Sequence, residues 1–93
     1  MSTYLYPSKR PKVGDVKEWI PIFIRSIEKD WRGIGGSVHV SYGYPFRDFY
    51  KVRYWADGSD KAVVKHFYGE SAVHEVRNYV YDLGFRDAHY DID

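Results

Sequence analysis

The amino-acid sequence predicts one α+β domain with the element order α-β-β-β-α and a further strand at the end. With 93 residues the chain has room for a single hydrophobic core. Two segments, 15–31 and 71–83, carry apolar residues at the helical period, and three segments between them alternate as strands do. Amphipathic helices need a common surface, so we expect two helices packed on one face of an antiparallel sheet of three to four strands.

The first predicted helix begins after Gly14, where Asp15 is the expected cap and Glu18 has the reciprocal capping-box position. Pro21 is discordant, because it should either kink the helix or begin its first turn, leaving 15–20 as a separate turn. Residues 1–13 are expected to form a mobile basic arm or an irregular lead-in. The apolar positions of this stripe are Val16, Trp19, Ile20, Phe23, Ile27 and Trp31.

The three predicted strands are 37–44, 49–56 and 61–68, and Asp57-Gly58 is a typical hairpin turn. The length of that turn decides which side of the third strand faces the core. A loop of two or four residues places Val63 and Phe67 beside Tyr54 and Tyr50, whereas a three-residue loop places Val64 there. We favour the even loop.

The second helix is predicted to begin at Ser71 as its cap and to end at Gly84, with Phe85 making a closing apolar contact. The tail, 87–93, alternates in polarity and predicts a fourth strand at the sheet edge, where its charges would discourage further pairing. The apolar stripe of the helix is Ala72, Val73, Val76, Tyr79, Val80 and Leu83.

Composition excludes several kinds of chemistry. There are no cysteines, which removes disulfides, thiolate zinc sites and cysteine nucleophiles. The four histidines have no zinc-ligand spacing, and no serine lies in a glycine elbow. We therefore expect a protein without catalytic activity, metal or cofactor. Because no apolar run suits a secretory signal or the roughly 20 residues of a membrane span, a cytoplasmic protein with no membrane partner is expected.

Aromatic content and charge distribution indicate a contact surface. A small core cannot bury all 3 Trp, 10 Tyr and 5 Phe, and exposed Tyr and Trp are enriched at interfaces. Residues 1–69 carry 12 Lys and Arg against 7 Asp and Glu, while residues 70–93 carry 2 against 6. The chain can therefore present a basic face although its net charge is only +1.

The candidate binding site lies on the middle predicted strand, opposite Tyr50, Val52 and Tyr54. If those three side chains pack on the helices, the other side shows solvent an alternation of rings and cations. A structural alternative is that the N-terminal arm or the tail covers Phe49 and Trp55. The candidate residues, with two from the neighbouring strands, are Phe49, Lys51, Arg53, Trp55, His39 and Lys65.

This surface suits two kinds of partner. Trp and Arg are common anchors in protein interfaces, so we expect a small binding protein that docks on another protein. An inhibitor or adaptor, such as a phage-encoded anti-defence factor of the anti-CRISPR kind or an immunity protein, fits the size. The alternative is a nucleic-acid-binding module that places cations on phosphates and rings on bases. The oligomeric state stays open.

Overall fold

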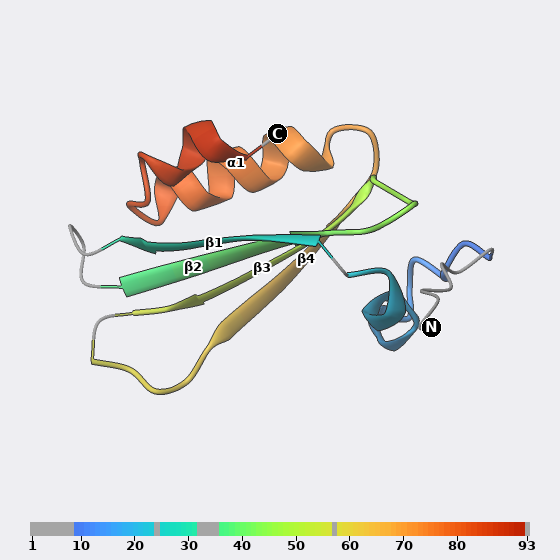
Figure 1. Ribbon diagram of the computed structural model, residues 1–93, viewed down its shortest axis with the longest axis horizontal. Coiled ribbons are helices and arrows are strands. Elements are labelled where there is room, and N and C mark those ends of the chain that lie inside the picture. Colours follow the sequence, from blue (N-terminus) through green and yellow to red (C-terminus); the bar gives the residue numbers. More distant parts are fainter. Residues whose placement is uncertain (1–8, 24, 32–35, 57, 93) are drawn as a thin grey trace, which may run out of the picture.

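The computed structural model describes residues 9–23, 25–31, 36–56 and 58–92, the segment 25–31 by its backbone alone. Four strands form one antiparallel sheet in the order β1-β2-β3-β4, and the helix α1 lies across one face of it (Figure 1). The predicted α+β class is confirmed. The elements are η1 (Val16–Ile22), β1 (Arg25–Trp31), β2 (Gly36–Tyr42), β3 (Phe49–Trp55), β4 (Val63–Tyr68), α1 (Ala72–Asp82) and η2 (Ala88–Asp91), where η denotes a 3₁₀ helix.

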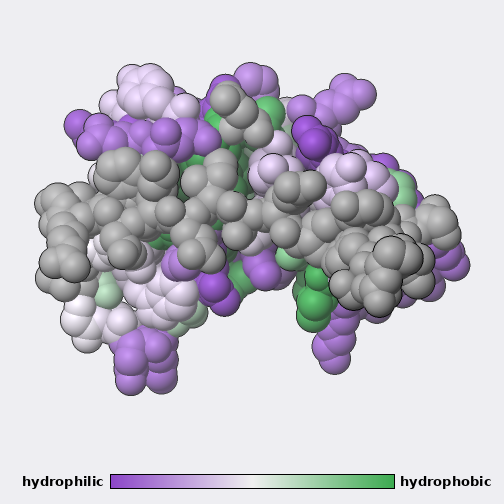
Figure 2. All heavy atoms as spheres, in the orientation of Figure 1, coloured by the Kyte–Doolittle hydropathy of each residue, from purple (hydrophilic) through white to green (hydrophobic). Residues whose placement is uncertain are grey.

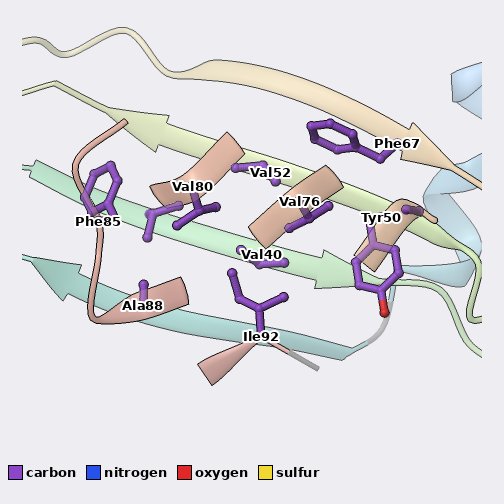
Figure 3. Packing of buried hydrophobic residues seen from close by; sticks show 11 residues of the cluster. Val40, Tyr50, Val52, Phe67, Val76, Val80, Phe85, Ala88 and Ile92 are labelled. Atoms are coloured by element: carbon purple, nitrogen blue, oxygen red, sulfur yellow. The ribbon is translucent and has the colours of Figure 1, made fainter. Parts of the chain in front are cut away.

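The main hydrophobic core lies between the sheet and α1. In Figure 3 the side chains of Val76 and Val80 on α1 point toward Val40 and Val52 of the sheet. These valines are at most 2% exposed, and each contributes roughly 1.5–3 kcal/mol by its burial. The same core includes Val38, Tyr50, Phe67, Ala72, Phe85, Ala88 and Ile92.

The register of β4 against β3 follows the favoured even loop. Tyr54 is paired with Val63 and Tyr50 with Phe67, although the connection between the strands is longer than the two or four residues expected. Because directly paired residues share a face, Phe67 reaches the core beside Tyr50.

Helix α1 ends as the sequence predicts. Gly84 has a φ of +104°, in the left-handed region that glycine adopts at low cost. The backbone N–H of Phe85 donates to the carbonyl of Val80 at 3.1 Å, and that of Gly84 to Tyr81 at 3.0 Å, which together form a Schellman motif. At the other end Ser71 differs from its predicted capping role, because its hydroxyl donates to the Glu75 carboxylate instead.

The helix predicted within 15–31 is wrong, both as a helix kinked at Pro21 and as one that begins there. The chain forms the short 3₁₀ helix η1 and then strand β1, which is paired with β2 from Arg25 opposite Tyr42 to Trp31 opposite Gly36. Asp15 is the cap, since its carboxylate accepts from the backbone N–H of Lys17 at 3.1 Å. Pro21 lies inside η1, where its missing N–H and fixed φ favour a short element over a continuing α-helix.

The first predicted helix therefore does not share a face of the sheet with α1. Helix η1 lies on the opposite side, at one end of the sheet (Figure 1), and forms a separate small cluster. The predicted edge strand in the tail is also wrong: η2 turns back along α1, and Ala88 and Ile92 are buried in the main core. Burial of these two apolar side chains under the helix layer replaces strand pairing.

Part of the predicted mobile arm is packed against the sheet. Residues 1–8 lie outside the described part of the chain, but Pro11 is buried and the guanidinium of Arg10 pairs with Asp48. The indole Nε1 of Trp19 donates to the carbonyl of Lys12 at 2.7 Å, which ties this segment to η1. Among the described residues no helix combines the length and apolar character needed to cross a membrane.

Candidate functional site

Among the described residues, the sheet face opposite α1 divides into a covered end and an open end whose side chains are half-buried or exposed. The covered end lies under η1, whereas the open end carries His39 on β2, Val64 on β4 and three residues of β3. Strand pairing brings these residues together, because Arg53 is directly opposite His39 on one side and Val64 on the other. We call the set His39, Lys51, Arg53, Trp55 and Val64 the open sheet face.

Phe49 is not part of this surface, and its predicted exposure is wrong. The residue is 0% exposed and packs edge-on against the ring of Trp19, with a centroid distance of 4.7 Å. Its other side contacts Tyr68 at 4.9 Å between centroids. Strand alternation places Phe49 on the predicted face, but η1 then covers it. Of the alternative cover by the N-terminal arm or the tail, the arm contributes Arg10, whose guanidinium carbon lies 5.1 Å from the centroid of the Phe49 ring.

Lys65 lies on the other side of the sheet, so its predicted grouping with Lys51 and Arg53 is wrong. It is paired with the core residue Val52, and its Nζ is 5.0 Å from the centroid of the Tyr79 ring on α1. The physical reason is the register: the even loop that turns Phe67 toward α1 turns Lys65 the same way. That register also places Val64 and His66 on the opposite face, and both could have been found from it.

Trp55 is the best-defined aromatic group of the open sheet face. The His39 ring meets it edge-on with a centroid distance of 5.3 Å. The guanidinium carbon of Arg53 lies 5.1 Å from the centroid of the Trp55 ring, a cation–π contact worth about 0.5–1 kcal/mol at an exposed site. Trp55 is half-buried and Arg53 is exposed. The indole thus contacts a histidine and a cation while it remains only half-buried.

Lys51 lies at the boundary between the covered and open ends. Its Nζ is 5.1 Å from the centroid of the Phe23 ring, just beyond η1. Partial burial, and then the charge of Arg53, lower the pKa of Lys51. Two neighbouring cations, of which Lys51 is partly buried and Arg53 exposed, favour an anionic group of a partner at this position.

His66, directly opposite Lys51 on β4, gives the fold a dependence on pH. Burial beneath Trp19, whose ring centroid is 5.4 Å away, lowers the pKa of His66 from its ordinary value of 6.5, and the Lys51 charge adds to this. The unfolded chain therefore binds more protons than the folded chain just below pH 6.5. The contribution of His66 to the free energy of unfolding is therefore fully present above that pH. It is lost as the pH falls toward the pKa of His66 in the folded state.

We expect the melting temperature to decrease between about pH 8 and about pH 5.5, and the decrease to be smaller in His66→Gln. The matched control is His74→Gln, since His74 is an exposed histidine on α1 and should leave the decrease unchanged. Thermal denaturation followed by circular dichroism measures both. An equal decrease in the wild-type chain and in His66→Gln would contradict this assignment.

Comparisons of the chain with known protein families, with curated proteins and with solved structures find no match. In the part of the chain that the structure describes, no group of three His, Asp or Glu side chains is placed to hold a metal ion. The chemistry of the open sheet face is therefore the basis for a functional proposal.

Proposed function

We propose that this chain is a non-enzymatic binding protein that docks on another protein through the open sheet face. The observation that carries the proposal is the half-buried Trp55 indole, which contacts His39 and Arg53 on the part of the sheet that η1 leaves uncovered. Trp and Arg are the residue types that most often dominate binding energy at protein interfaces. A ring that is already oriented loses little further entropy on binding.

Charge defines the partner more closely. Lys51 and Arg53 stand on the same side of β3 as Trp55, so the complementary surface would present Asp or Glu side chains around an apolar recess for the indole. We further propose that the protein acts as an inhibitor or adaptor, by occupying such a surface. A phage-encoded anti-defence factor or an immunity protein would act in this way. A cytoplasmic location agrees with the cysteine-free composition, which suits a reducing compartment.

The test is affinity capture from the source cells with the tagged chain, followed by binding measurements on the captured protein. Trp55→Ala should stay folded and lose about thirtyfold in affinity, the equivalent of about 2 kcal/mol for a central anchor. The control Asn78→Ala, at an exposed position of α1, should bind as the wild-type chain does.

Two results would contradict the proposal. One is a folded Trp55→Ala variant that binds the captured protein with unchanged affinity. The other is capture that nuclease abolishes and that weakens steeply with salt, because phosphate contacts release counterions whereas an aromatic anchor does not. In that case the open sheet face would be the surface of a nucleic-acid-binding module.

A further inference from the structure

The layer formed by α1 and η2 carries a row of three rings on the side of the molecule away from the open sheet face. Tyr81 on α1 meets His89 on η2 with a centroid distance of 5.2 Å, and His89 meets Tyr90 at the same distance. Tyr90 is 78% exposed, and Tyr81 is 39% exposed. A tyrosine this exposed adds nothing to the core, so its packing does not explain its position.

The row is anchored to the core rather than loosely attached. The Nδ1–H of His89 donates to the backbone carbonyl of Arg77 at 2.9 Å. On either side of the His89–Tyr90 pair, Ala88 and Ile92 are buried at 2% and 1% exposure. The backbone of η2 and the His89 ring are therefore anchored, which lowers the entropy lost when a partner binds.

The surroundings of the row are acidic. Between residues 77 and 92, the part of the chain that forms the row, there are three acids against two cations. Asp82, next to Tyr81 on α1, and Asp87, before η2, are exposed. Figure 2 shows strongly hydrophilic residues along the outer edge of this layer, at the top of the view. A cationic group of a partner is therefore attracted to this side of the molecule.

One cation already occupies a ring of the row. The guanidinium carbon of Arg86 lies 5.1 Å from the centroid of the Tyr81 ring. The layer therefore already contains a cation–π contact between a tyrosine and an arginine of the same chain. The Tyr90 ring is the most exposed large hydrophobic side chain among the described residues, and it meets His89 through an edge contact. A second arginine, supplied by a partner, can lie over Tyr90 as Arg86 lies over Tyr81.

We propose that Tyr81, His89 and Tyr90 form a second docking surface, whose partner is an arginine-rich protein segment. The surface lies on the opposite side of the sheet from Trp55, so both can be occupied together. The chain would then join an acidic partner surface to a basic one, as an adaptor does. This inference does not depend on the function proposed for the open sheet face, because the two surfaces share no residue.

The experiment uses the full chain and a fluorescent peptide of alternating arginine and glycine, with a glutamate–glycine peptide as the charge control. Fluorescence anisotropy should detect binding of the arginine peptide, and any binding of the glutamate peptide at the open sheet face should not change in Tyr90→Ala. Tyr90→Ala should weaken that binding about fivefold, as expected for a partly exposed cation–π contact, while Tyr90→Phe keeps it within about twofold. Trp55→Ala, on the other side of the sheet, should bind the peptide normally.

A mapping experiment locates the peptide. Amide chemical shifts should change around residues 78–92 on titration and stay unchanged along β3. The proposal is overturned if Tyr90→Ala or Tyr90→Leu binds as tightly as the wild-type chain, because the ring face then makes no contribution. It is also overturned if the shifts map to β3 or if the arginine peptide does not bind.

Discussion

Replacing Phe49 with alanine is expected to lower the free energy of unfolding by about 3–5 kcal/mol, the range for truncating a buried aromatic ring. Phe49 is 0% exposed and lies between the rings of Trp19 and Tyr68. Its backbone carbonyl also accepts from the N–H of Gly43 at 2.9 Å, where an added Cβ on Gly43 would lie 2.8 Å from Ile22. Such close packing leaves the site little freedom to collapse into the cavity that alanine would create.

Urea denaturation followed by circular dichroism measures this loss, and Arg53→Ala is the matched control. Arg53 is on the same strand and the same side of the sheet as Phe49, but it is exposed. Removing its contact with Trp55 should cost no more than about 1 kcal/mol. Similar losses in the two variants would show that Phe49 is not a core residue and that η1 does not cover it in solution.

The elements around the main core could be predicted from the sequence because their patterns have one interpretation. Val76 and Val80 are spaced at the helical period. The apolar pattern ends before Gly84, whose positive φ is typical of the end of a helix. Tyr50 and Val52 alternate with charged residues, as a strand buried on one face does. Local pattern and tertiary packing agree there, so neither overrides the other.

The N-terminal third could not be predicted in the same way, because its pattern fits two structures. The spacing of Val16, Trp19 and Ile20 is helical, and in the structure these residues lie in the 3₁₀ helix η1. Beyond Pro21 the apparent helical stripe continues by coincidence. Strand β1 is paired with β2 along its whole length, a long-range contact that the sequence of this segment alone does not show.

The strand predicted over 87–93 was wrong for a related reason. Ala88 and Ile92 are four residues apart, a spacing that strand alternation and a helical turn both allow. Because both are buried beside α1, the tail closes the helix layer instead of extending the sheet. Packing against residues distant in the sequence therefore determines the conformation of the tail.

For the candidate site, strand alternation correctly places Lys51, Arg53 and Trp55 on one side of β3. It does not reveal what lies over that side. Whether Phe49 is open or covered depends on where η1 docks, which is a contact between segments distant in the chain. The position of Lys65 could have been predicted from the sequence, because the even loop that places Phe67 on the α1 side of the sheet places Lys65 on that side as well.

Replacing Trp19 with alanine is expected to release η1 from the sheet while the main core stays folded. The indole is 2% exposed, contacts Phe49, and donates from Nε1 to the carbonyl of Lys12 at 2.7 Å. Its truncation removes roughly 3–5 kcal/mol of local packing. The cluster of Trp19, Ile22 and Phe49 is separate from the core under α1, so this part of the chain can open without the rest.

Native-state amide hydrogen exchange distinguishes local release from global unfolding. The N–H of Tyr44 donates to the carbonyl of Ile22 at 2.8 Å, and its protection should decrease on the order of a hundredfold or more in Trp19→Ala. The N–H of Phe85, bonded to Val80 at the end of α1, should keep its protection. The global loss of stability is then limited to the free energy of docking η1, because once η1 has opened, further weakening of its contacts no longer changes the rest of the fold. Equal loss of protection at Tyr44 and Phe85 would instead mean that the two clusters unfold as one cooperative unit.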